Sequence, residues 1–275
     1  MPVGKAIGVA FDRRGDGEPL LLIHGTGGSR SHWAPVVDLL ATERDMVLVD
    51  LPGHGESDPP RQGIPHTPIG YARVLAELLD ELALDSAHIA GNSVGGWTAL
   101  ELAKLGRARS VVAIAPAGLW EKRDPWRCTF RLSSQYRPGR LFSPLVPSLM
   151  RSGLGRTVLL RGTVAKPRQI PAEDAIGMVT TYARTPGFRA HLSATRRERF
   201  REGQGIDVPV VVAWGDKDRL IPAKARRREE LPPHTRFVTL PACGHSPMWD
   251  APELVSATIL EVAAKQPLPT GPRGR

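Results

Sequence analysis

The sequence of 275 residues lacks the features that mark several protein classes. Its two cysteines, Cys128 and Cys243, lie far apart without metal-ligand spacing, so we expect neither a disulfide framework nor a zinc site. No apolar run approaches the roughly 18 residues that a membrane-spanning helix needs. Met1 to Phe11 lacks the basic start and apolar stretch of a signal peptide. We therefore predict a cytoplasmic protein without a membrane partner.

Nucleotide-binding signatures are missing as well. The sequence contains no G-x-x-x-x-G-K-[ST] pattern, which excludes a P-loop. Gly25 and Gly27 follow an apolar run, as they would in a dinucleotide-binding turn, but the third glycine position holds Arg30. An arginine there obstructs the close packing of helix and strand that this turn requires. We predict that the protein uses no organic cofactor and no metal.

The charge of the chain is concentrated in one segment. The net charge is +9, and residues 119–205 hold 17 basic and 6 acidic residues, which leaves the remainder slightly acidic. This basic excess has two interpretations: attraction of an anionic small-molecule substrate, or a solvated surface in a chain that uses arginine throughout. The segment shows neither aromatic residues interleaved with the basic ones nor a known nucleic-acid-binding motif, so we predict no nucleic-acid partner.

The rest of the chain alternates between short apolar runs and segments with helical spacing. The runs predict buried parallel strands, because such strands are covered on both faces and lose the alternating pattern. The expected strands are residues 19–24, 45–51, 87–91, 110–115, 208–214 and 236–240, and the expected helices are 31–42, 69–84, 94–105 and 252–264, with one or two edge strands in 3–14. Strands joined by helical crossovers predict an α/β fold with a doubly wound, mostly parallel sheet.

One long segment breaks this alternation. Residues 119–205 contain no convincing apolar strand, much arginine and proline, and helical patches such as 172–183. We expect a mainly helical cap inserted into a core formed by residues 1–118 and 206–265. The tail, residues 266–275, is rich in Pro, Gly and Arg, and we expect it to be disordered.

The chemistry is indicated first by residues 91–96, Gly-Asn-Ser-Val-Gly-Gly, between an expected strand and an expected helix. A serine on a sharp strand-to-helix turn is held in a strained conformation, and Gly91 and Gly95 supply the room that this turn needs. Ser93 is therefore the candidate nucleophile. The turn also directs the backbone N–H of Val94 toward an oxyanion that forms beside the serine.

Three further motifs follow expected strands. His24-Gly25-Thr26-Gly27-Gly28 offers a second oxyanion donor, the backbone N–H of Thr26. A carboxylate follows the strand before residue 215, and His245 follows the last strand. The chain order serine, acid, histidine is the order of α/β-hydrolases and differs from that of chymotrypsin and subtilisin. We expect the histidine to act as the base.

With these motifs the chain resembles the α/β-hydrolase superfamily, specifically its capped esterases, lactonases and carbon–carbon bond hydrolases. Leu51-Pro52-Gly53-His54-Gly55-Glu56-Ser57 also resembles a loop of that family. The resemblance implies that the acid is Asp218, with Pro222 in register, and leaves Asp216 as the alternative. Family members that open epoxides or remove halogens use an aspartate nucleophile, and a serine at position 93 argues against both activities.

The sequence thus predicts a serine hydrolase that cleaves a carboxylic ester, lactone or related acyl compound through Ser93, His245 and Asp218. Two alternatives stay open: carbon–carbon hydrolysis of a β-diketone-like acid, and a ligand-binding module that has lost turnover. Candidate pocket residues are Gly27, Asn92, Trp33, Met248 and Trp249, and the three large apolar ones have burial in the core as the alternative. We expect His24 and His54 to support loop backbone groups near the oxyanion turn.

Overall fold

The computed structural model describes residues 3–120, 128, 130, 132–133, 143–196, 198–221 and 226–264. Its described part contains one eight-stranded sheet in the order β1-β2-β4-β3-β5-β6-β7-β8. The strands are β1 Val3–Ala6, β2 Val9–Arg14, β3 Glu18–Ile23, β4 Arg44–Val49, β5 Ala87–Asn92, β6 Ala108–Ile114, β7 Val210–Gly215 and β8 Arg236–Leu240. β1, β2 and β4 pair antiparallel, and every pairing from β4 to β8 is parallel. The predicted α/β class with a mostly parallel sheet is confirmed.

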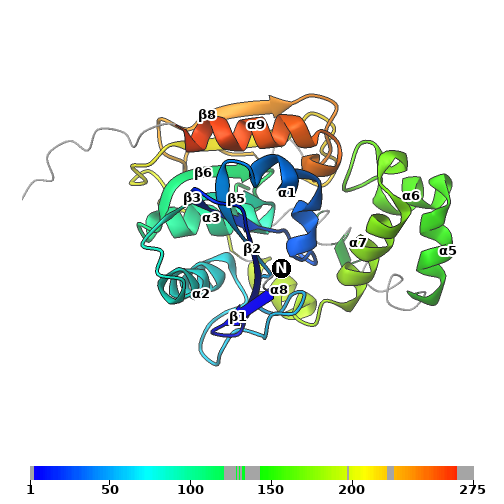
Figure 1. The fold of residues 1–275 in the computed structure, drawn as a ribbon, viewed down its shortest axis with the longest axis horizontal. Helices are drawn as coiled ribbons and strands as arrows, with labels where there is room; N and C mark the ends of the chain where they lie inside the picture. Colours follow the sequence, from blue (N-terminus) through cyan, green and yellow to red (C-terminus); the bar gives the residue numbers. More distant parts are fainter. Residues whose placement is uncertain are drawn as a thin grey trace, which may run out of the picture.

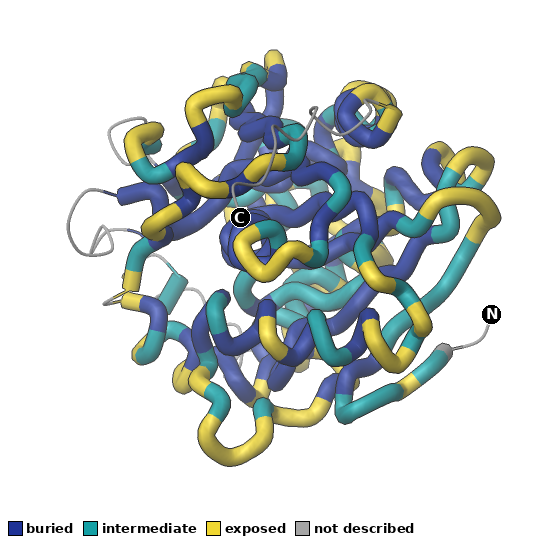
Figure 2. The backbone as a smooth tube through the Cα atoms, turned by 90° about the vertical axis from the view of Figure 1, so that its left-hand side faces the viewer, coloured by how far each residue is buried: buried dark blue, intermediate teal, exposed yellow. Residues whose placement is uncertain are grey.

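Helices cover both faces of this sheet (Figure 1). One face packs against α2 (Pro68–Glu81) and α3 (Val94–Lys104), and the other against α1 (Ala34–Leu40) and α9 (Pro252–Ala263). Because β3 to β7 are buried on both faces over most of their length, their sequences are mostly apolar and do not alternate. In Figure 2 the buried backbone, in dark blue, runs through the middle of the molecule, and exposed stretches, in yellow, lie at its outside.

The described elements between β6 and β7 are all helical. They are η2 Ser143–Leu145, α5 Val146–Arg151, α6 Gly153–Leu160, η3 Pro167–Gln169, α7 Ala172–Arg184 and α8 Phe188–Thr195. A small apolar cluster of their own residues, which includes Val146, Met150 and Leu160, holds α5 to α7 together. In Figure 1 these three helices stand to one side of the sheet. The division into core and cap stays a prediction, and Pro222 and the tail 266–275 lie outside the described residues.

No helix in the described ranges is both long and apolar enough to cross a membrane.

Candidate active site

Ser93 sits on a strained turn between β5 and α3. Its φ of 57° and ψ of −117° lie outside the regions that a serine normally occupies. The Ser93 N–H donates to the Ile114 carbonyl at 2.8 Å, which anchors the turn to β6. A Cβ on Gly91 would lie 2.2 Å from the Gly95 carbonyl, and one on Gly95 would lie 2.2 Å from the Ile23 carbonyl. The glycines are therefore required by backbone contact on both sides of the serine.

The loop after β3 passes directly against this turn. A Cβ on Gly25 would meet the Ser93 Cβ at 3.0 Å, and the Gly28 N–H donates to the Gly25 carbonyl at 3.1 Å. This tight turn contains Thr26. Val94 is the first residue of α3, so its N–H has no helical carbonyl partner. Ser93, Thr26 and Val94 all line one cavity.

His24 holds the start of this loop in place through both of its ring nitrogens. The Leu51 N–H donates to its Nε2 at 2.9 Å, so the other ring nitrogen, Nδ1, carries the proton and donates to the Gly25 carbonyl at 2.7 Å. The ring is fully buried, and burial lowers the pKa of His24 to about 3. His24 is thus a neutral support for loop backbone groups.

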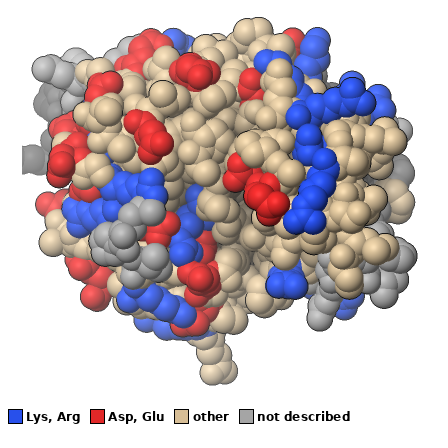
Figure 3. Space-filling view, turned by 45° about the vertical axis from the view of Figure 1, so that its right-hand side comes forward, with Lys and Arg blue, Asp and Glu red and all other residues tan. Residues whose placement is uncertain are grey.

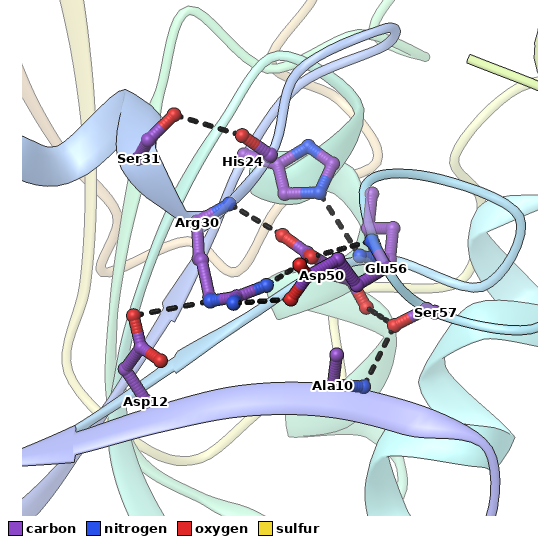
Figure 4. A network of polar contacts seen from close by, with 10 residues as sticks. Ala10, Asp12, His24, Arg30, Ser31, Asp50, Glu56 and Ser57 are labelled. Carbon is purple, nitrogen blue, oxygen red and sulfur yellow. Dashed lines mark hydrogen bonds and ion pairs between the residues drawn. The ribbon is translucent and has the colours of Figure 1, made fainter. Parts of the chain in front are cut away.

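A partly buried ion-pair network holds the far end of the same loop (Figure 4). The Arg30 guanidinium contacts Asp50, Asp12 at 3.0 Å and Glu56 at 2.6 Å. Asp50, which has no exposed surface, also accepts from the Arg30 N–H at 2.6 Å and the Glu56 N–H at 2.9 Å. Burial would lower the pKa of Arg30, but the surrounding carboxylates outweigh it and raise that pKa. The arginine that excludes dinucleotide binding therefore ties together the loops after β3 and β4.

His245 and Asp218 form a buried pair. His245 Nδ1 lies 3.0 Å from Asp218 Oδ2, and neither side chain is more than 4% exposed. Asp218 Oδ1 accepts from the backbone N–H groups of Leu220 at 2.8 Å and Ile221 at 3.1 Å. Burial would raise the pKa of Asp218, but the imidazole and these N–H groups outweigh burial and hold it below the ordinary value. The alternative acid, Asp216, instead accepts from the Cys243 N–H at 3.3 Å.

The other ring nitrogen of His245 is open for chemistry. Its Nε2 is buried and has no hydrogen-bond partner among the described residues. Because Nδ1 faces a carboxylate, Nδ1 carries the proton and Nε2 keeps its lone pair. His245 and Ser93 line the same cavity. The arrangement can accept a proton from a group in that cavity.

Two polar residues that the sequence did not single out for this purpose fix the histidine loop. Asn92 Nδ2 donates to the His245 carbonyl at 2.9 Å and thereby links the residue before Ser93 to the opposite loop. Asp250 accepts from the N–H groups of Gly244 at 2.8 Å and Ala165 at 2.9 Å. No local motif marks Asp250, because its partners come from segments far apart in the chain.

His191, from α8, reaches the oxyanion loop from the other side. Its Nδ1 lies 3.1 Å from the His66 carbonyl, which can only accept, so Nδ1 carries the proton. Its Nε2 then accepts from the Thr26 hydroxyl at 3.1 Å. Burial lowers the pKa of His191 to about 3, which keeps the ring neutral. A single histidine inside a basic helical segment gave no sequence signal for this contact.

The cavity has a volume of about 390 Å³ and a mostly apolar wall. Gly27 and Asn92, two of the candidate pocket residues, line it. Trp33 and Met248 do not: both are fully buried in the core between the sheet, α1 and α9. Trp249 packs between that core and the cluster of α5 to α7 and does not line the cavity either. The alternative interpretation, burial in the core, therefore describes Trp33 and Met248, whereas Trp249 is only partly buried.

Metal and thiol chemistry find little support in the described residues. Within those ranges no group of three His, Cys, Asp or Glu side chains is arranged to hold a metal ion. Cys243 is fully buried, and burial, with the nearby Asp250, raises the pKa of its thiol to about 11. Cys243 is therefore a buried apolar residue beside the histidine loop.

Comparison with known proteins identifies the family. The model of the alpha/beta hydrolase family matches residues 20–258, so the chain belongs to this family. The fold agrees with that of the carboxylesterase CesB of Bacillus subtilis, with a TM-score of 0.74 and 19% identity over 95% of this chain and 90% of that one.

Three curated relatives differ in their named activities. The chain is 31% identical over 265 residues (93% of its length) to the dihydrolipoyllysine-residue acetyltransferase component of an acetoin cleaving system of Pseudomonas putida, of which it spans 66%. It is 32% identical over 195 residues (66% of its length) to the epoxide hydrolase EphH of Mycobacterium tuberculosis, of which it covers 90%. It is 29% identical to the pimeloyl-[acyl-carrier protein] methyl ester esterase of Xanthomonas axonopodis pv. citri, over 94% of this chain and 99% of that one.

Proposed function

We propose that the chain is a serine hydrolase that cleaves a carboxylic ester through an acyl-enzyme. The observation that carries this proposal is the buried pair of Asp218 and His245, whose free Nε2 shares a cavity with Ser93 on its strained turn. A serine hydroxyl is a poor nucleophile at neutral pH unless a base takes its proton. A neutral imidazole, oriented through its other nitrogen, is such a base.

In the proposed reaction, Ser93 Oγ attacks the acyl carbon while His245 Nε2 takes the hydroxyl proton. The carbonyl oxygen becomes an oxyanion, and its collapse expels the alcohol, which receives the proton from His245. Water then attacks the acyl-enzyme with the same base, and the second tetrahedral intermediate releases the acid and restores Ser93. Asp218 keeps the imidazole in one tautomer and stabilises the imidazolium that forms twice in the cycle.

The oxyanion is assigned to the backbone N–H groups of Thr26 and Val94. His24, His191 and the Arg30 network hold the loop of Thr26, and the bond from the Ser93 N–H to the Ile114 carbonyl holds the turn of Val94. The donors therefore need little reorganisation during the reaction. Each such donor contributes about 3–4 kcal/mol to the lowering of the barrier. The mechanism requires no metal or organic cofactor, because the protein's own groups supply nucleophile, base and oxyanion donors.

The cavity wall favours an uncharged acyl group. Its apolar part comes mainly from the helices between β6 and β7, including Leu145, Val146, Leu160, Met178, Val179 and Leu192. Among the described residues Arg196 is the one Lys or Arg that lines the cavity. A neutral ester therefore fits better than the anionic β-diketone acid of a carbon–carbon hydrolase. The esterase relative fits this chemistry, and the epoxide hydrolase relative does so less, because position 93 is a serine.

A fluorophosphonate probe tests the proposal. It should label the wild-type protein and a Ser193→Ala control, which lacks an exposed serine of α8, but not Ser93→Ala. Hydrolysis of a short p-nitrophenyl ester should fall by about 10³-fold or more in Ser93→Ala alone. Full activity of that variant would refute the assignment. Absence of labelling in the wild type would favour a binding module without turnover.

A further inference from the structure

Large apolar side chains are exposed mainly on one part of the molecule. Of the nine such residues in the described chain, five fall on or next to α5 and α6: Leu145, Leu149, Leu154, Val158 and Leu159. Leu154 and Val158 are each 67% exposed and lie one helical turn apart on α6. A contiguous group of exposed apolar side chains on a protein surface usually marks a site of interaction with a partner.

The same segment is basic and carries no acidic residue. Between positions 143 and 172 the sequence contains four arginines and one lysine but no Asp or Glu. Arg161 and Arg168 are exposed, and neither forms an ion pair with a carboxylate among the described residues. Arg161 follows Leu154 and Val158 at helical spacing, so it extends their face of α6. In Figure 3, which brings the side of α5 to α7 forward, Lys and Arg side chains form a band with uncharged surface on one side and a few Asp and Glu side chains on the other.

This surface is continuous with the mouth of the cavity. Leu145, Leu149 and Leu159 are exposed, and they also line the cavity that contains Ser93. An apolar path therefore runs from the outer face of α5 and α6 toward the nucleophile. Basic residues beside exposed leucines complement a surface that is apolar inside and anionic outside, as a bilayer with acidic headgroups is.

We propose that the outer face of α5 and α6, with the adjoining η2 and η3, docks on an anionic lipid surface. This face consists of Leu145, Leu149, Leu154, Val158, Leu159, Arg161 and Arg168. The leucines and the valine enter the boundary between headgroups and acyl chains, while the two arginines bind the anionic headgroups. Docking places the cavity mouth against the lipid, so the acyl compounds that reach Ser93 are those dissolved in it. That last step rests on the proposed function; the docking itself does not. The predicted lack of a membrane partner came from the missing long apolar run, and this surface is instead assembled from short helices.

Co-sedimentation with vesicles tests the docking. The full-length protein should bind equimolar phosphatidylglycerol and phosphatidylcholine vesicles at low salt, and bind pure phosphatidylcholine vesicles much more weakly. Leu154→Ser combined with Val158→Ser should lower the partition coefficient by about tenfold or more, because two large exposed apolar groups no longer enter the lipid. Arg161→Gln and Arg168→Gln should each lower it about fivefold, and together they should flatten its salt dependence.

Matched controls separate docking from nonspecific effects. Leu105→Ser removes an exposed leucine directly after α3, and Arg73→Gln removes an exposed arginine of α2. Both variants should bind vesicles as the wild type does. The α6 double variant should keep wild-type hydrolysis of a short water-soluble ester, since Leu154 and Val158 do not line the cavity. Ser93→Ala should still bind vesicles, so a failure of the proposed function would leave this result intact.

Three outcomes would overturn the proposal. The wild type could stay in the supernatant with anionic vesicles, or the α6 variants could bind as well as the controls. Alternatively, sedimentation velocity could show a dimer that the α6 double variant converts to monomer, without any vesicle binding. That result would assign the face to a second copy of the chain.

Discussion

Acidification should destabilise this protein through three buried histidines. The rings of His24, His54 and His191 form a chain, with centroids 5.4 Å and 5.8 Å apart. Each is at most 1% exposed, and burial lowers each pKa to about 3. In the unfolded chain the same groups titrate near pH 6.5. Between these values the unfolded state binds more protons, so the free energy of unfolding rises with pH and falls on acidification.

The size of the effect follows from the two pKa values. At pH 5 each histidine is almost fully protonated in the unfolded chain and neutral in the folded one, which costs about 2 kcal/mol per residue. Three such residues together cost about 6 kcal/mol, a large part of the 5–15 kcal/mol typical of a folded protein. The cost is absent above about pH 7, grows as the pH falls from 6.5 and is complete below 3. The carboxylate of Asp218, whose pKa is lowered, adds its own loss of stability only below about pH 4.

Urea unfolding followed by tryptophan fluorescence measures this directly. The midpoint should fall steeply between pH 7 and 5 while the slope m stays constant. His54→Asn removes one titrating ring and should reduce the proton uptake on unfolding by about one. His234→Asn, a substitution at an exposed site, should change the midpoint at pH 7 little. A midpoint that does not change between pH 7 and 5 would refute the reasoning.

Three further substitutions test the site and its supports. Asp218→Asn keeps the shape of the side chain but removes the charge that orients the imidazole, so kcat for a p-nitrophenyl ester should fall by about 10³–10⁴-fold. Gly27→Ala places a methyl group 2.4 Å from the ring of Tyr182 at a φ of +74°; kcat should fall about tenfold or more as the oxyanion loop shifts, which steady-state kinetics will show. Asp250→Ala leaves three backbone N–H groups without their acceptor and should lower the free energy of unfolding by about 2–4 kcal/mol in urea titrations, while Asp207→Ala, at an exposed site, should change it little.

The sequence by itself determined the sheet and the edge at which the chemistry gathers. Buried parallel strands must be apolar runs, and a motif that follows such a strand must emerge at its carboxyl end. The sequence also identified Gly91 and Gly95 beside Ser93. A side chain at either position would lie 2.2 Å from a backbone carbonyl, so only glycine fits. These features depend on neighbours in the chain, so a local pattern is enough to find them.

Only the tertiary structure decided which side chains meet. Asp216 and Asp218 share one turn, and the direction of each side chain selects Asp218 as the partner of His245. Trp33 points into the core, although its position beside the oxyanion loop suggested a pocket. The contacts of His191 and the basic-apolar face of α5 and α6 join residues that no sequence spacing relates. The physical reason is that the whole fold sets the direction of each side chain and the packing between distant segments. A local sequence pattern does not specify either of them.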